Sequence, residues 1–179
     1  MTKVQKGDIM FMLVVTFIVT FVSGCGQPHV RTIKELMDTS NYSNIYVANA
    51  EVSSKEQTDV AKGLNQKFSK FATDEMVRAL KQKSAYAVVG NISPAPKTLV
   101  AETTIDIAYG SRALRYWVGF GAGSGSITVN TKLKDSLSSE IKLEMETRGN
   151  LSVGAFGGSM EAVIMDSIKE GISKFVAKL

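Results

Sequence analysis

The chain has 179 residues, of which 44% are hydrophobic and 21% are charged, and it contains three prolines. This balance is typical of a single globular domain and excludes a disordered chain. The net charge is +4, and basic residues alternate with acidic ones along most of the chain, which argues against nucleic-acid binding.

Residues 1–24 have the pattern of an export signal. Lys3 and Lys6 precede a stretch, residues 9–22, that contains no charged residue. A membrane-spanning helix needs about twenty apolar residues to cross about 30 Å of hydrocarbon, so this stretch is short for a permanent span. The pattern predicts a cleaved leader, and removal of Lys3, Lys6 and Asp8 with it takes the net charge from +4 to +3.

The residues around Cys25 resemble a known processing site. Val22, Ser23 and Gly24 precede the cysteine, and together the four residues resemble a bacterial lipobox. The resemblance implies that the thiol receives a diacylglyceryl group, that a signal peptidase cuts before the cysteine, and that the new amino terminus receives a fatty acid such as palmitate. Cys25 is the only cysteine, and acylation accounts for this odd thiol. The alternative is an uncleaved single-pass anchor with a bystander cysteine.

Acylation would make the membrane the first partner of the protein, through Cys25. Each buried CH₂ contributes about 0.8 kcal/mol and one chain alone holds only marginally, so two or three chains give a stable anchor. Gly26 follows the cysteine, where an Asp would resemble the inner-membrane retention signal of enteric bacteria. The outer membrane, with the domain facing the periplasm, is therefore favoured if the host is Gram-negative.

Residues 25–43 are expected to form the lipidated cysteine and a polar tether. They contain Pro28 and at most one weak helical turn. His29 lies in this tether without ligand partners at metal spacing, so we interpret it as a solvated linker residue. Residues 44–179 are then expected to form a single domain.

Hydrophobic periodicity predicts the elements of that domain. Apolar residues recur every three or four positions over residues 60–80 and 160–179, which predicts two amphipathic helices. Alternation or short apolar runs predict strands over residues 44–52, 85–89, 99–109, 127–133 and 141–148, and the last two strands form a hairpin.

This order, β-α-β-β-β-β-α, predicts an α+β fold. We expect an antiparallel sheet of about four to five strands, with both helices packed on one face of it. Gly171 lies inside the terminal helix, where it costs up to about 1 kcal/mol relative to Ala, so close packing is expected at that position.

Residues 109–126 differ from the rest of the domain in composition, because they hold five of the fifteen glycines and the only tryptophan. Here the chain resembles the bacterial lipoprotein family of domain of unknown function 4410. The resemblance lies in residues 111–125, in the alternating hairpin with Asp135, and in the preceding lipobox. The family usually has a glycine in the hairpin turn, where this chain reads DSLSS over residues 135–139. The resemblance implies a fold and a localisation, but no activity.

The glycines of this segment recur mainly every second residue, which matches neither a dinucleotide-binding nor a phosphate-binding loop. In one interpretation they form a glycine-rich strand entry, with Tyr116, Trp117 and Phe120 packed into the core. In the other the segment is a projecting loop, in which the same aromatic residues and Arg112 and Arg115 bind an anionic partner, since Trp, Tyr and Arg dominate interface hot spots.

The sequence contains no convincing catalytic site. Cys25 is used for acylation and His29 lies on the tether, so the domain keeps neither residue type for a nucleophilic triad or a zinc site. Glu144 and Glu146 share a strand face, as a glycosidase pair could. Lys142 and Arg148 lie beside them, however, which favours a solvated surface. We expect no enzyme activity, no metal and no cofactor.

Two classes of function remain. The favoured class is a membrane-anchored, non-catalytic accessory or interaction protein of the bacterial cell envelope, with an envelope protein as its partner. The alternative is a periplasmic small-ligand or envelope-stress-related binding module. An enclosed apolar pocket would favour the binding module, whereas an exposed apolar patch would favour the interaction protein.

Overall fold

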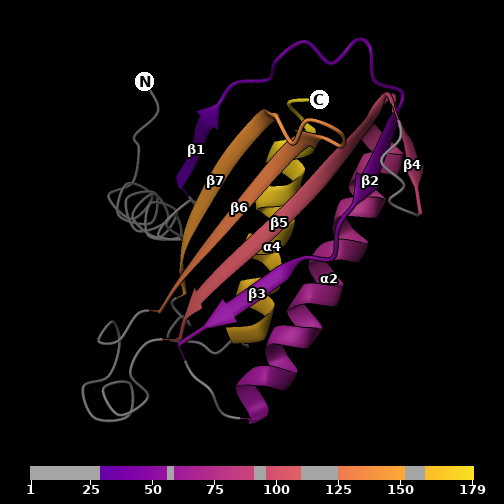
Figure 1. Ribbon diagram of the computed structural model, residues 1–179. Helices are drawn as coiled ribbons and strands as arrows, with labels where there is room; N and C mark the ends of the chain where they lie inside the picture. The colour runs from indigo at the N-terminus through magenta and orange to yellow at the C-terminus, as the bar shows by residue number, and fades with distance from the viewer. Residues whose placement is uncertain (1–28, 56–58, 91–95, 110–124, 152–159) are drawn as a thin grey trace, which may run out of the picture.

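A computed structural model describes residues 29–55, 59–90, 96–109, 125–151 and 160–179 of the chain (Figure 1). Its elements are the strands β1 (His29–Lys34), β2 (Asn44–Val47) and β3 (Glu51–Ser54), the helix α2 (Asp59–Lys83), the strands β4 (Ala87–Val89), β5 (Thr98–Ala108), β6 (Gly125–Asp135) and β7 (Ile141–Leu151), and the helix α4 (Met160–Val176). Within these ranges no helix is both long and apolar enough to cross a membrane.

The expected α+β fold with two helices is confirmed, and Figure 1 shows both helices behind one face of a single sheet. The sheet has more strands than the four to five predicted, and not all of them are antiparallel. The described residues form seven strands, in the order β1-β7-β6-β5-β2-β4 with β3 also on β5, and β2, β3 and β4 run parallel to their partners. The parallel pairs arise because α2 carries the chain back along the sheet before β4 begins, as a crossover connection requires.

The single strand expected over residues 44–52 is two strands, β2 and β3, which follow each other along β5. The interruption lies at Ala50, whose backbone bonds to α2 instead of the sheet. Its N–H donates to Thr73 Oγ1 at 2.9 Å, and its carbonyl oxygen accepts from Ser69 Oγ at 2.5 Å. Two helix hydroxyls therefore satisfy the backbone groups that a continuous strand would have paired.

The tether expected over residues 25–43 contains a strand, so His29 is solvent-exposed as expected but belongs to the sheet and not to a linker. β1 pairs antiparallel with β7, and His29 lies opposite Arg148. Side chains of β1 alternate in exposure, and Val30 packs against the core. The register slips between Thr32 and Lys34. A six-residue edge strand depends on the neighbouring strand for its stability, so its local sequence gives little signal.

The core lies between the helices and the covered face of the sheet. Its largest fully buried side chains come from both helices and from β2, β5, β6 and β7, and include Phe68, Met76, Leu99, Ile127, Leu143 and Phe175. The close packing predicted at Gly171 is confirmed. A Cβ atom there would lie 3.3 Å from Thr147 Oγ1 and 3.4 Å from Val129 Cγ1. The missing side chain thus lets α4 approach β6 and β7 closely.

Candidate interaction surface

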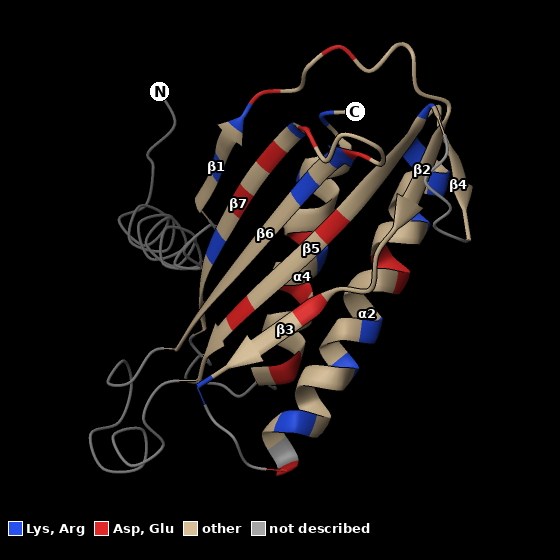
Figure 2. Ribbon diagram, viewed as in Figure 1, with Lys and Arg blue, Asp and Glu red and all other residues tan. Residues whose placement is uncertain are grey.

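The face of the sheet that is turned away from α2 and α4, here called the open face, carries polar and charged side chains. Figure 2 shows acidic and basic residues alternating across its strands. One row crosses four strands in register, with Lys34 opposite Glu144, Glu144 opposite Lys132, and Lys132 opposite Glu102. We call these four residues the charged row. Opposite charges on neighbouring strands stabilise the sheet and fix its register.

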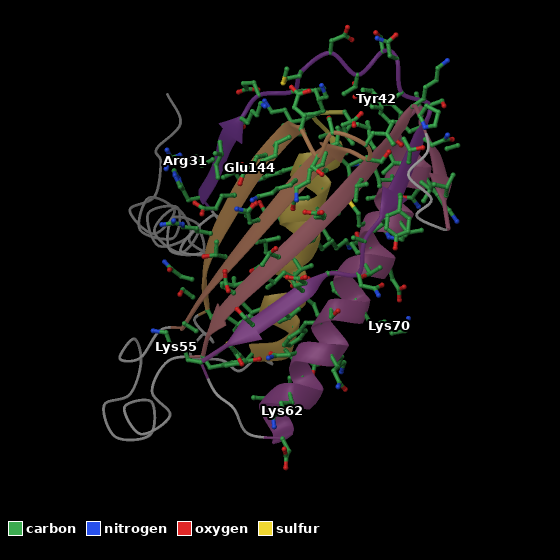
Figure 3. The ribbon with its side chains drawn as sticks, viewed as in Figure 1. Arg31, Tyr42, Lys55, Lys62, Lys70 and Glu144 are labelled. Carbon is green, nitrogen blue, oxygen red and sulfur yellow. The ribbon has the colours of Figure 1, made fainter. Side chains whose placement is uncertain are left out.

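Ion pairs hold three of the four residues of the charged row. Lys132 Nζ lies 3.3 Å from Glu144 Oε1, and Asn130 Nδ2 donates a hydrogen bond of 3.4 Å to the same oxygen. Glu102 pairs with Lys134, whose Nζ lies 2.5 Å from Glu102 Oε2. The row therefore presents fixed charges of both signs. Figure 3 labels Glu144 on β7 and Arg31 on the edge strand β1, where Arg31 lies opposite Glu146.

Glu144 and Glu146 share the open face, as the alternation of β7 predicts, but their side chains are only 15% and 16% exposed. They lie on the surface as expected, but the two side chains are more covered than a fully solvated surface implies. Each carboxylate has its own cation, since Glu146 Oε1 lies 2.9 Å from Arg148 Nε while Glu144 binds Lys132. Neighbouring long side chains cover such carboxylates because their aliphatic stems lie along the sheet.

A hollow of about 370 Å³ lies where β3 and β5 end and β6 begins. It is lined by Ser53, Ser54, Lys55, Asp106, Ile107, Ala108, Ser126 and Thr128. Ser53 Oγ donates a hydrogen bond to Asp106 Oδ1. The lining thus combines hydroxyl groups with one carboxylate and one ammonium group, unlike the enclosed apolar pocket expected of a small-ligand module.

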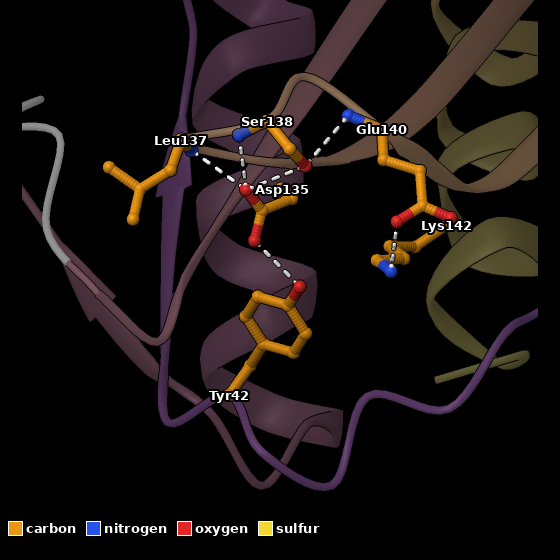
Figure 4. Close-up of polar contacts among 6 residues, drawn as sticks. All are labelled: Tyr42, Asp135, Leu137, Ser138, Glu140 and Lys142. Carbon is orange, nitrogen blue, oxygen red and sulfur yellow. Dashed lines mark hydrogen bonds and ion pairs between the residues drawn. The ribbon is translucent and has the colours of Figure 1, made fainter.

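A second polar cluster lies at the opposite end of the sheet, at the β6–β7 hairpin turn (Figure 4). Asp135 Oδ1 accepts hydrogen bonds from the backbone N–H of Leu137 at 2.8 Å and of Ser138 at 2.6 Å. Asp135 Oδ2 accepts a bond of 2.6 Å from the Tyr42 hydroxyl. The backbone N–H of Ser138 and the Tyr42 hydroxyl hold the pKa of the Asp135 carboxyl well below its ordinary value.

The same cluster changes the ionisation of its neighbours. The hydrogen bond to Asp135 raises the pKa of Tyr42, and the bond to Glu140 raises the pKa of Lys142. Lys142 Nζ also lies 6.0 Å from the centroid of the Tyr42 ring. The bond from Tyr42 to Asp135 joins the segment between β1 and β2 to the hairpin turn, so we interpret the cluster as structural.

The residues proposed from the sequence lie outside the described ranges: Cys25, Arg112, Arg115, Tyr116, Trp117 and Phe120. Gly125, which follows that segment, does lie within them. A Cβ atom at Gly125 would fall on the carbonyl oxygen of Ala108, so only glycine fits where β5 and β6 first meet. The sequence did not indicate the bond from Tyr42 to Asp135, because no local spacing links residues that far apart.

Residues 24–158 match the family model described as domain of unknown function (DUF4410). No curated protein matches the chain.

Solved structures with a similar fold include PelC from Paraburkholderia phytofirmans, described as a dodecamer. Its TM-score is 0.50 at 12% sequence identity, and the match covers 82% of this chain and 95% of that one. A dodecamer of a PelC point variant from the same organism, in another crystal form, has a TM-score of 0.47 at 15% identity, with the same coverage. Lipoprotein GNA1162 from Neisseria meningitidis has a TM-score of 0.39 at 9% identity, covering 76% of this chain and 99% of that one. At such identities the likeness concerns the fold alone.

Proposed function

The chain belongs to the family of the domain of unknown function (DUF4410), and from that premise we propose that it is a lipid-anchored, non-catalytic accessory protein of the bacterial cell envelope. In this proposal Cys25 carries the acyl chains, and the open face of the sheet binds another envelope protein. The anchor would lie in the outer membrane, facing the periplasm, in a Gram-negative host.

The position of β1 supports the anchor. The first described strand begins at His29, four residues after Cys25, and is hydrogen-bonded to β7. A domain whose sheet begins this close to an acylated cysteine is held at the membrane surface. Two or three acyl chains are enough for stable attachment, whereas one chain holds only marginally.

The single observation that carries the interaction role is the open face, which none of the described elements covers. β1, β7, β6, β5 and β3 contribute to it, while the two described helices pack on the other side (Figure 1). Several of its charges already pair within the sheet, so a partner with complementary charge gains specificity without leaving those charges isolated and buried. The large hydrophobic side chains that are exposed in the described ranges, Ile33, Met37 and Leu137, come from β1, the link after it and the hairpin turn.

The contacts of the candidate acids support a non-catalytic role. A glycosidase pair needs one carboxyl group that stays protonated and one that stays free to act on the substrate. Glu144 and Glu146 instead each bind a cation on the open face. His29 lies exposed on the edge strand, opposite Arg148.

A second candidate function, a periplasmic small-ligand or envelope-stress-related binding module, rests on the hollow at the end of β5. Its hydroxyl groups, Lys55 and Asp106 could bind a small polar molecule. Ligand-dependent thermal stabilisation that is lost in Asp106→Ala, but kept in Lys132→Ala on the open face, would favour this function over the first.

The experiment that tests the interaction role is site-specific photocrosslinking in intact cells of the native host. A photoreactive amino acid is placed at Thr104 or Asn130 on the open face, or at Lys70 on the outer side of α2 as a control (Figure 3). We expect one discrete envelope protein crosslinked at positions 104 and 130 and absent at position 70. Equal crosslinking at all three positions, or none at 104 and 130, would overturn the role.

A further inference from the structure

We infer that the domain rests on the membrane by one end of its sheet, so that phospholipid headgroups contact that end. This end, here called the anchor end, is where β3, β5 and β7 finish and β6 starts, at Ser54, Ala108, Leu151 and Gly125. The opposite, distal end carries the hairpin turn and the carboxyl terminus (Figure 1). The inference rests on the proposed acylation of Cys25.

The length of the tether limits which surfaces can reach the bilayer. Cys25 and His29 are four residues apart, a span of at most about 14 Å in a fully extended chain. His29 lies opposite Arg148, and Leu151 follows Arg148 by three residues, which is about 10 Å along a strand. An extended tether therefore brings the acylated cysteine to the level of the anchor end.

The distal end is out of reach of the same tether. β7 begins at Ile141, seven residues before Arg148, which is about 23 Å along the strand. A tether of about 14 Å that starts at His29 cannot turn back and cover that distance. The direction of β1 agrees with this limit, because the chain enters β1 from the anchor end and runs antiparallel to β7 toward the distal end.

The chemistry of the anchor end suits phospholipid headgroups. Hydroxyl groups line its hollow, with Lys55 as the ammonium group and Asp106 as a carboxylate that already accepts a bond from Ser53. Hydroxyl and ammonium groups donate to phosphate and ester oxygens. The charged row lies elsewhere, across the half of the sheet nearer the hairpin turn (Figure 2).

Both helices begin at the anchor end, so the positive ends of both helix dipoles point toward the headgroup phosphates. The carboxylates in the first turns are paired with lysines. Asp59 lies 3.7 Å from Lys62, and Glu161 lies 2.6 Å from Lys67. These pairs offset the carboxylate charges, which would otherwise repel phosphate.

This orientation leaves the open face upright and accessible along its length. β6 has eleven residues, so the hairpin turn stands about 36 Å above the anchor end. An envelope protein that binds the open face would therefore approach from the side.

The test uses full-length acylated protein, reconstituted in vesicles of phosphatidylethanolamine and phosphatidylglycerol that contain a headgroup-quenching lipid. A fluorophore is attached through Lys55→Cys or Ser126→Cys at the anchor end, or through Leu137→Cys at the distal end and Lys70→Cys on α2 as controls; all four side chains are exposed. The mass of the intact protein is measured on the same samples.

We expect loss of fluorescence at positions 55 and 126 and none at positions 137 and 70. Equal quenching at position 137, or no quenching at 55 and 126 while the mass shows acylated Cys25, would overturn the orientation and leave the anchor standing. A mass with a bare Cys25 thiol would overturn the anchor and this inference together.

Discussion

His29 lies opposite Arg148 at the edge of the sheet. The first described strand therefore begins four residues after Cys25, so under the proposed acylation the anchor and the sheet would be almost continuous. In the proposed anchored protein, a short connection of this kind would fix the part of the domain that meets the membrane, whereas the tether of nearly twenty residues expected from the sequence would have left the orientation free.

Gly171 allows a stringent test of the packing between α4 and the sheet. Gly171→Leu should destabilise the domain by about 2 kcal/mol, because its side chain would be forced against Thr147 and Val129. The matched control is Gly63→Leu on α2, where nothing lies within 4 Å of the added Cβ. That change should stabilise by up to about 1 kcal/mol through helix propensity. Urea unfolding measures both, and equal effects would contradict the packing.

Asp135→Ala should lower the free energy of unfolding by about 1–2 kcal/mol, because it removes the acceptor for the hairpin turn and for Tyr42. Asp38→Ala is the control, since the bonds of that carboxylate are local and come from the backbone N–H and the hydroxyl of Ser40. Its effect on urea unfolding should be clearly smaller. If the two variants lose the same free energy of unfolding, the bonds of Asp135 do not stabilise the hairpin turn.

The same carboxylate should make stability depend on pH in acid. The pKa of Asp135 is lowered in the folded protein from an ordinary value of 3.8. Its contribution is therefore complete above 3.8 and is lost as the pH falls below that value toward the folded pKa. The difference in unfolding free energy between the wild type and Asp135→Ala should be constant from about pH 7 to about pH 5 and shrink below about pH 4. A constant difference down to about pH 3 would argue against the shift.

Lys132→Glu should separate the interaction role from stability. It places a third negative charge beside Glu144 and Glu102, which should cost only about 1 kcal/mol because Lys132 is partly exposed. We expect crosslinking at position 104 to disappear. Lys70→Glu replaces the ion pair with Asp74 on the outer side of α2 by two negative charges, and it should leave crosslinking unchanged. Loss of crosslinking in both variants would contradict a role for the charged row.

The alternation of apolar and polar residues was sufficient to predict β5, β6 and β7, because each of these strands has one covered face and one open face. The two helices followed from apolar residues at helical spacing. β1 and the break at Ala50 could not be predicted, because each depends on contacts far along the chain. β1 depends on the free edge of β7, and Ala50 depends on Ser69 and Thr73.

The candidate surface was predictable only in part. The sequence placed Glu144 and Glu146 on one face together, since they are two residues apart on a strand. It gave no indication that their side chains would be largely covered, nor that Lys34, Lys132 and Glu102 would complete a row with Glu144. Those relationships depend on strand register, which is set by pairing across the sheet.

The most direct test of the anchored-domain proposal is the intact mass of the protein purified with detergent from its native host. The account predicts a chain that begins at Cys25 and carries a diacylglyceryl thioether, with a further acyl chain on the new amino terminus. A chain that still carries Met1, or one with a free thiol at position 25, would contradict it.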